Sequence, residues 1–123
     1  MGAGRRRILG QRGEAAVESW YRRAGYEVIA RNWRCPEGEI DIIARSPEGA
    51  AVICEVKTRS SAAYGSPFEA VTRAKQRRLR RLAARWLASE GAGVGYGRIR
   101  FDVAAVTVDP GGSLVVEVRE AAF

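Results

Sequence analysis

The sequence predicts an α/β fold in which a mixed β-sheet is flanked by helices, with the elements in the order α-β-β-β-α-β-β. Two stretches carry apolar residues at helical spacing. Five runs are rich in β-branched residues or alternate between apolar and polar side chains, as strands do. The chain of 123 residues is expected to form a single domain, because 46% hydrophobic and 28% charged residues make an ordinary globular composition.

The first half of the chain reads as one helix followed by three strands. The helix is expected over residues 6–24, behind a basic and mobile arm at residues 1–5. Gly25 is suited to end it, because glycine adopts the left-handed conformation of a helix cap. A strand over residues 26–31 follows. The next two strands, at 38–44 and 51–59, are joined by the turn signal Pro47-Glu48-Gly49 and predict an antiparallel hairpin.

The second half begins with a clear helix start. Ser66-Pro67-Phe68-Glu69 offers an N-cap serine, a proline at the first helical position and a glutamate after one turn, which is a capping box. We expect this helix to run to about Glu90. A glycine-rich connector at 91–97 then leads to an alternating strand over 98–108, and a turn returns the chain as a final hairpin strand over 114–119.

Acidic side chains interrupt the two most apolar strands. Glu39 and Asp41 are expected to share one face of their strand, because strand side chains alternate. Glu55 and Lys57 share one face of the next strand in the same way. If the hairpin is symmetric about Glu48, Asp41 lies directly across from Glu55, and such partners have Cβ atoms about 4.5 to 5.5 Å apart. Two carboxylates at such a short distance favour a cation between them. A register slip of one residue would instead send one of them to the opposite face, and both would then be solvated strand residues.

The overall charge favours a polyanionic partner. The chain carries 21 lysines and arginines against 14 acids, a formal net charge of +7, with a pI near 10.2. Seven cations without an intervening acid fall on the second predicted helix: Arg73, Lys75, Arg77, Arg78, Arg80, Arg81 and Arg85. We interpret this helix as a phosphate-binding surface. The alternative is an ordinary solvated helix face.

The residues that are missing exclude several kinds of chemistry. With no histidine in the chain, the usual zinc sites, Ser-His and Cys-His hydrolases and histidine-based nucleases are excluded. A metal would be held by oxygen ligands, which favour Mg²⁺ or Mn²⁺. The two cysteines, Cys35 and Cys54, come without a secretory signal or a long apolar span, so a cytoplasmic protein with reduced thiols is expected.

The arrangement of Asp41, thirteen residues and then Glu55-Val56-Lys57 resembles the PD-(D/E)xK nuclease signature. Together with other segments, it resembles the YraN-type bacterial endonuclease-like family, which is related to the archaeal Holliday-junction resolvases. Those other segments are Gly13-Glu14, Arg31-Asn32-Trp33-Arg34, Gly38-Glu39-Ile40-Asp41, Thr58-Arg59, Tyr64-Gly65, Lys75 and Arg100-Phe101-Asp102-Val103. Ile40 stands where the signature of the superfamily has its proline.

The resemblance implies a restriction-endonuclease-like core and metal-dependent hydrolysis of phosphodiester bonds in DNA, including branched or structured DNA. By this resemblance Asp41 and Glu55 hold Mg²⁺ or Mn²⁺, the Val56 carbonyl is a third oxygen ligand, and Glu14 completes or extends the site. A homodimer is expected by the same analogy.

The remaining roles concern the reaction and the substrate. Lys57 is expected to orient the attacking water or to stabilise the transition state, since it is a cation beside an anionic phosphorane. Glu39 is expected to steer that lysine. Nucleic acid, DNA rather than RNA, is expected to contact Arg59, Tyr64, Arg73, Lys75, Arg77, Arg78 and Arg81.

Two alternatives remain at the level of sequence. One is a non-catalytic protein that binds DNA or RNA. The other is a protein-interaction domain whose basic helix meets an acidic partner. Carboxylates that face phosphates give a pure binding protein no advantage, which favours the nuclease.

Overall fold

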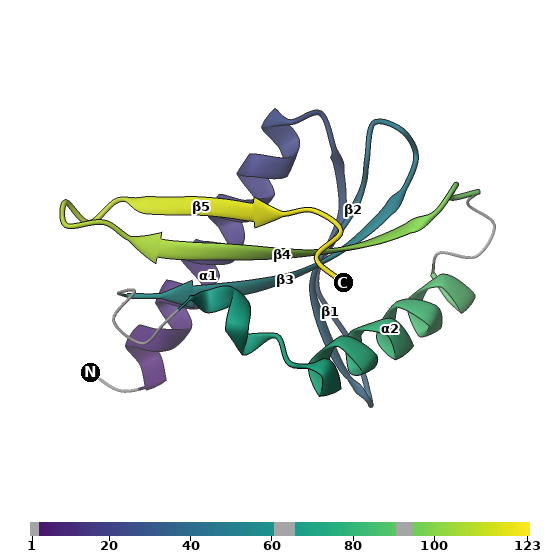
Figure 1. Cartoon of the computed structure of the whole chain (residues 1–123), viewed down its shortest axis with the longest axis horizontal. Helices are drawn as coiled ribbons and strands as arrows, with labels where there is room; N and C mark the ends of the chain where they lie inside the picture. Colours follow the sequence, from purple (N-terminus) through teal and green to yellow (C-terminus); the bar gives the residue numbers. More distant parts are fainter. Residues whose placement is uncertain (1–2, 61–65, 91–94) are drawn as a thin grey trace.

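The computed structural model describes residues 3–60, 66–90 and 95–123. Its elements are α1 (Ala3–Arg23), β1 (Glu27–Cys35), β2 (Gly38–Arg45), β3 (Ala51–Arg59), the short 3₁₀ helix η1 (Pro67–Ala70), α2 (Arg73–Ala88), β4 (Ile99–Val108) and β5 (Leu114–Arg119). The five strands form one sheet in the order β1-β2-β3-β4-β5 (Figure 1). Among the described strands, β3 and β4 pair in parallel and the other neighbours pair antiparallel, so the sheet is mixed as predicted. The α/β fold class and the order of elements are confirmed.

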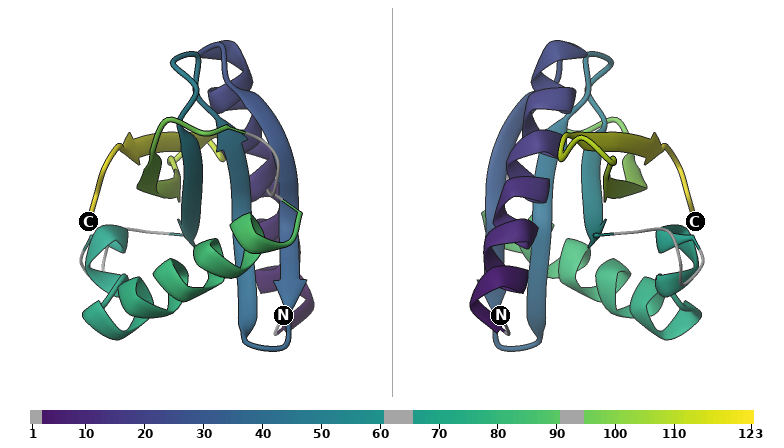
Figure 2. Two further views of the ribbon diagram at one scale, coloured as in Figure 1. Left: turned by 90° about the vertical axis from the view of Figure 1, so that its right-hand side faces the viewer. Right: turned by 90° about the vertical axis from the view of Figure 1, so that its left-hand side faces the viewer.

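The two long helices cover opposite faces of the sheet. In Figure 2, α2 lies in front of the sheet in the left view and α1 lies in front of it in the right view. Val17 and Tyr21 of α1 pack in one buried cluster with residues such as Ile42. Leu79 and Trp86 of α2 pack in a second cluster on the other face. Neither helix, as far as it is described, is long and apolar enough to cross a membrane.

The end of α1 is the predicted one, but its start is not. Gly25 has φ of +88°, its N–H donates to the Arg22 carbonyl at 3.1 Å, and the Tyr26 N–H donates to the Tyr21 carbonyl at 3.0 Å. This pair of bonds is a Schellman cap. The helix begins at Ala3 and not at the predicted residue 6, because a helix continues readily through arginines.

The predicted helix from Ser66 to Glu90 is in fact two elements. The Ser66 hydroxyl accepts a hydrogen bond from the Phe68 N–H at 3.3 Å, but it caps only the short η1. Val71 is buried and Thr72 is extended, so the chain turns there. The Thr72 hydroxyl then accepts from the Lys75 N–H at 3.3 Å and starts α2, which ends at Ala88. Serine and threonine are both good N-cap residues, and the prediction took Ser66 as the single cap.

A buried carboxylate links α1 and the C-terminal residues to the sheet. Asp102 in β4 is fully buried and accepts from the Tyr21 hydroxyl at 2.7 Å. The Arg100 guanidinium donates to both oxygens of Asp102, at 2.9 and 2.8 Å, and the Ala121 N–H donates at 3.1 Å. Because the buried charge is paired and fully hydrogen-bonded, it holds α1, β4 and the C-terminal residues in one arrangement.

Gly13 sets how closely α1 approaches β3. A Cβ atom at this position would lie 2.2 Å from the Thr58 hydroxyl oxygen and 3.2 Å from the Thr58 Cβ. At Gly10, one turn earlier, a Cβ would meet nothing within 4 Å. Glycine at position 13 therefore allows the close contact that brings the neighbouring Glu14 toward the strands.

We expect Gly13→Ala to lower the free energy of unfolding by about 1 kcal/mol, because overpacking costs about 1 to 3 kcal/mol and alanine returns about 1 kcal/mol of helix propensity. The matched change Gly10→Ala should instead stabilise the protein by about 0.5 to 1 kcal/mol. Urea denaturation measures both. Thr58→Ala should relieve part of the loss in the Gly13→Ala background, and equal stabilisation by the two glycine changes would contradict the close contact.

Candidate functional site

The sheet divides where β2 and β3 stop pairing. Their antiparallel ladder runs from Arg45–Ala51 to Ile42–Cys54, which is the register predicted from symmetry about Glu48. Beyond it, β2 continues to pair with β1 and β3 continues to pair with β4. The two strand pairs diverge in Figure 1, and we call the opening between them the fork. The next position of the register puts Asp41 and Glu55 at the start of the fork.

Asp41 takes the place of the missing strand partner. Its Oδ2 accepts a hydrogen bond from the Val56 N–H at 2.8 Å. The N–H and C=O of one strand residue point to the same side. The Val56 carbonyl is therefore expected to face the fork as well, where it is close to the Asp41 carboxylate.

The backbone near Asp41 departs from simple strand alternation. Ile40 packs in the cluster under α2, whereas Ile42 packs in the cluster under α1, although alternation would place both on one face. The register of β1 and β2 puts Asn32 opposite Asp41, and Asn32 has φ of +53°. β2 thus changes at Asp41 which face its side chains take, and the Asp41 side chain points into the fork, toward the Val56 N–H. β1 is also longer than predicted and continues to Cys35.

Three carboxylates gather on one side of the fork. Glu14, Glu39 and Asp41 each have an oxygen within 4.8 Å of the others. Arg31 lies 3.8 Å from Glu14, and Arg34 forms an ion pair with Glu39 at 2.9 Å. The structure thus brings together the predicted residues Glu14, Glu39 and Asp41. It does not place Glu39 beside Lys57 as expected, because the divergence of β2 from β3 carries Glu39 away and toward Arg34.

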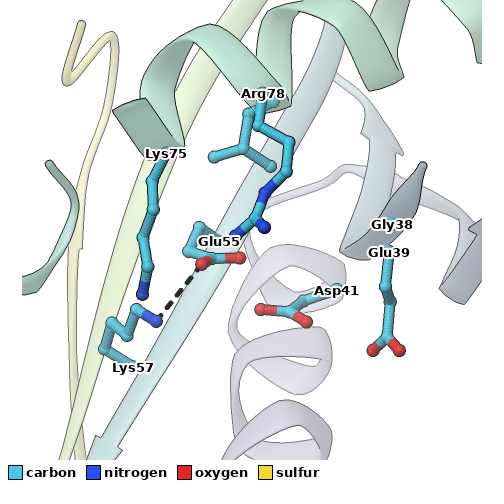
Figure 3. A pocket seen from close by; sticks show the side chains of 8 residues that line it. Gly38, Glu39, Asp41, Glu55, Lys57, Lys75 and Arg78 are labelled. Carbon is cyan, nitrogen blue, oxygen red and sulfur yellow. Dashed lines mark ion pairs between the residues drawn. The ribbon is translucent and has the colours of Figure 1, made fainter. Parts of the chain in front are cut away.

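The other side of the fork is basic (Figure 3). The Lys57 ammonium is 3.3 Å from the Glu55 carboxylate on the same strand face, as alternation predicted. Lys75 and Arg78 reach the same place from α2. Together with Gly38, Glu39, Asp41, Glu55, Lys57 and Leu79, they line a pocket of about 270 Å³.

The ionisable groups of this pocket shift one another's pKa. Burial and the neighbouring Glu55 carboxylate raise the pKa of Asp41 to about 8. The hydrogen bond from the Val56 N–H lowers this pKa but does not offset the other two effects. Burial lowers the pKa of Lys57, but contact with Lys75 and the charge of Glu55 more than offset this effect and raise it. The pKa of Lys75 is lowered, first by its hydrogen-bonding contact with Lys57 and then by burial. Such shifts are typical of functional sites.

The predicted nucleic-acid contacts divide into separate groups. Arg73, Arg77 and Arg81 are exposed on the outer face of α2, and Arg59 is exposed at the end of β3. Tyr64 lies outside the described residues.

The structure gives two other cations of α2 a different environment. The Arg80 guanidinium lies over the Phe101 ring at 4.8 Å from its centroid, and Arg85 pairs with Glu37. These two arginines therefore have partners within the fold.

Sequence reasoning missed two features of the site. Arg31 pairs with Glu14 and with Glu18, at 3.8 and 3.1 Å, and so screens the acidic side of the fork. Its position beside the acids follows only from the packing of α1 on β1. Lys75 and Arg78 were predicted as part of a helix surface, whereas they line the pocket of the carboxylates.

The fold and the site together define an α/β protein with a charged pocket at the fork of a mixed sheet, acidic on one side and basic on the other. The chain belongs to the uncharacterised protein family UPF0102, whose match covers residues 13–106. It is 52% identical over 110 residues to a UPF0102 protein of Beutenbergia cavernae, covering 89% of this chain and 90% of that protein. It is 48% identical over 120 residues to a UPF0102 protein of Moorella thermoacetica, covering 96% of this chain and 97% of that protein. It is 44% identical over 120 residues to a UPF0102 protein of Nocardia farcinica, covering 98% of this chain and 92% of that protein.

The raised pKa of Asp41 leads to a stability prediction. Because this pKa is about 8 in the folded protein and ordinarily 3.8, the folded state binds the proton more tightly than the unfolded state. The stability due to the protonated carboxyl is thus complete below about pH 4 and is lost as the pH rises toward 8, by at most about 1.4 kcal/mol per pH unit. With chelator present, we expect Asp41→Asn to gain stability relative to the parent as the pH rises from 5 to 8.

Chemical denaturation at pH 5, 6.5 and 8 measures this difference. Glu48→Gln, in the exposed hairpin turn, is the matched control and should give the same difference at each pH. An Asp41→Asn advantage that does not grow with pH would show that Asp41 is ionised in the metal-free protein.

Proposed function

We propose that the protein is a metal-dependent nuclease that hydrolyses phosphodiester bonds in DNA, with branched or structured DNA as the preferred form. The observation that carries this proposal is the pairing of two carboxylates and a lysine at the fork. Asp41 is largely buried beside Glu55, and Lys57 lies 3.3 Å from Glu55. The choice of DNA, and of branched DNA, rests on the likeness to the resolvases.

The donor set of the fork fits a hard divalent cation. Asp41, Glu55 and the Val56 carbonyl offer oxygen ligands, and Glu14 adds another from α1. Repulsion from Glu55 and burial both disfavour the ionised form of Asp41, and a cation between the two carboxylates would offset both effects. Oxygen ligands favour Mg²⁺ or Mn²⁺.

Such an ion, when bound, lowers the pKa of a water molecule and neutralises charge on a phosphate. The side chains of the fork supply the rest. Lys57 is held by Glu55 at the edge of the pocket, where its ammonium can donate to a phosphate oxygen and stabilise the charge that develops in the transition state. Glu39 supports the acidic side next to Glu14 and Asp41, while Arg34 limits the repulsion among the three.

The outer face of α2 would hold the rest of the substrate. Arg73, Arg77 and Arg81 are spaced four residues apart and share one face of the helix. Phosphate contacts of this kind supply most of the affinity for nucleic acid without reading its sequence.

Incubation with branched, single-stranded and duplex DNA, with Mg²⁺ or Mn²⁺ and with chelator, tests the proposal. We expect cleavage only with metal. Asp41→Asn and Glu55→Gln should lose both metal binding and cleavage. Lys57→Ala should bind Mn²⁺ as the parent does but cleave about 10² to 10³ times more slowly, because lysine acts on the transition state.

Calorimetric titration with Mn²⁺ separates these variants. Glu48→Gln serves again as the control and should bind the ion as the parent does. If Asp41→Asn also binds Mn²⁺ as tightly as the parent, the metal site is not at the fork.

The arginines of the outer face lead to a separate prediction on affinity. Replacing Arg73, Arg77 and Arg81 with alanine should weaken binding to all DNA sequences. It should also lower the slope of log affinity against log salt by up to about three units, because each phosphate contact releases about one counterion.

The control for this triple variant removes three other exposed arginines, Arg12, Arg23 and Arg98, and so makes the same change in net charge. Its slope should stay close to that of the parent. Equal loss of slope in both triple variants would mean that the affinity comes from the overall charge and not from α2.

A further inference from the structure

The two lysines of the chain meet at the pocket. Of the 21 lysines and arginines, 19 are arginine, and the only lysines are Lys57 and Lys75. Lys57 lies on β3 and Lys75 on α2, yet both line the pocket at the fork, and the ends of their side chains lie side by side (Figure 3). Nothing in the local sequence requires this meeting.

The use of lysine at both positions has a chemical meaning. An ammonium is a compact charge with three donors on a flexible stem, whereas a guanidinium is a planar fork that suits bidentate partners. A chain that uses arginine for nearly all of its cations has lysine at the two positions that share this pocket. The site therefore favours compact donors that can approach one small anion together.

The cations of the pocket are not neutralised by the protein. Glu55 pairs with Lys57 at 3.3 Å, but within the described ranges neither Lys75 nor Arg78 forms an ion pair. Two ammonium groups in contact, with a guanidinium nearby, repel one another. An anion bound among them would remove that repulsion and accept hydrogen bonds from all three.

The position of these cations relative to the carboxylates decides which anion fits. In Figure 3, Asp41 and Glu39 lie at one end of the pocket, Lys75 and Lys57 lie at the other, and Glu55 lies between them. A phosphate held at Asp41 and Glu55 through a metal would engage Lys57, and it would leave Lys75 and Arg78 free for a second anionic group. The neighbouring phosphate of a nucleic-acid strand is such a group.

We propose that Lys75 and Arg78, beside Lys57, form an anion subsite that holds the phosphate next to the scissile one. This inference rests on the proposed nuclease function and narrows its substrate class. The substrate is then a strand with at least two consecutive phosphates, and a mononucleotide or a cyclic nucleotide would fill only part of the site.

The subsite can be tested without metal and without cleavage. Protein grown with [¹³Cε]lysine gives signals from only two side chains, and we would titrate it with inorganic phosphate in the presence of chelator. Both lysine signals are expected to shift with one common dissociation constant. Lys75→Gln and Arg78→Gln should each weaken phosphate binding about tenfold or more, as expected for the loss of a charge-assisted hydrogen bond.

Arg98→Gln is the matched control, because it removes one exposed cation outside the pocket. It should leave the constant within about twofold of the parent value. Lysine signals that do not move at saturating phosphate would overturn the subsite. Equal weakening by Arg98→Gln and Lys75→Gln would overturn it too, since binding would then follow net charge alone. Removal of the Lys57–Lys75 repulsion should leave Lys75→Gln at least as stable as the parent, so lost binding could not be assigned to unfolding.

The requirement for two phosphates needs a second measurement. With Ca²⁺ present, TpTpT should bind at least about tenfold more tightly than TpT, and Lys75→Gln should remove most of this difference. Equal affinities for the two oligonucleotides would overturn the requirement. The outcomes remain separable from those of the proposed function. If the protein binds phosphate at these residues but never cleaves DNA, the subsite is supported and the nuclease function is not. If Lys75→Gln leaves both cleavage and phosphate binding unchanged, the subsite is refuted and the nuclease function is not.

Discussion

The end of the pairing between β2 and β3 is the constraint on which the site depends. A continuous sheet would have used the Val56 N–H for a strand hydrogen bond and would have left no space beside Glu55. Because the ladder stops at Ile42–Cys54, the Asp41 carboxylate takes that N–H instead. Helices on opposite faces of the sheet can then reach the fork, where Glu14 of α1 joins the acidic side and Lys75 of α2 lines the pocket. The division of the sheet thus explains why the pocket is acidic on one side and basic on the other.

Features that depend on local chemistry were predictable from the sequence. The symmetric turn around Glu48 set the register that brings Asp41 and Glu55 to corresponding positions. Gly25 capped α1 because few other residues adopt a positive φ without strain. Apolar residues at helical spacing predicted a helix where α2 lies, and Leu82 and Trp86 of that helix are buried.

Features that depend on packing between distant segments were not predictable in this way. Ser66 and Thr72 are both good N-cap residues, and only the burial of Val71 between them decides that the chain turns there. Glu39 was expected beside Lys57, but β2 has left β3 at this position, and Glu39 pairs with Arg34, its partner on β1. Lys75 belongs to the pocket only because of the angle at which α2 crosses the sheet. Glu14 was predicted from the family resemblance alone, and its position near the strands requires the close approach at Gly13.

The parallel pairing of β3 with β4 has a kinetic consequence. The hairpin of β2 and β3 is local in sequence and can form rapidly by closing a short turn, which brings Asp41 and Glu55 together. Lys75 arrives only with the crossover through η1 and α2, which becomes fixed when β4 inserts beside β3. Closing that long loop costs entropy before its contacts form, so it is the slower event. We therefore expect Asp41 and Glu55 to meet during folding before Lys75 joins Lys57, so that the pocket acquires its full charge only when the crossover is fixed.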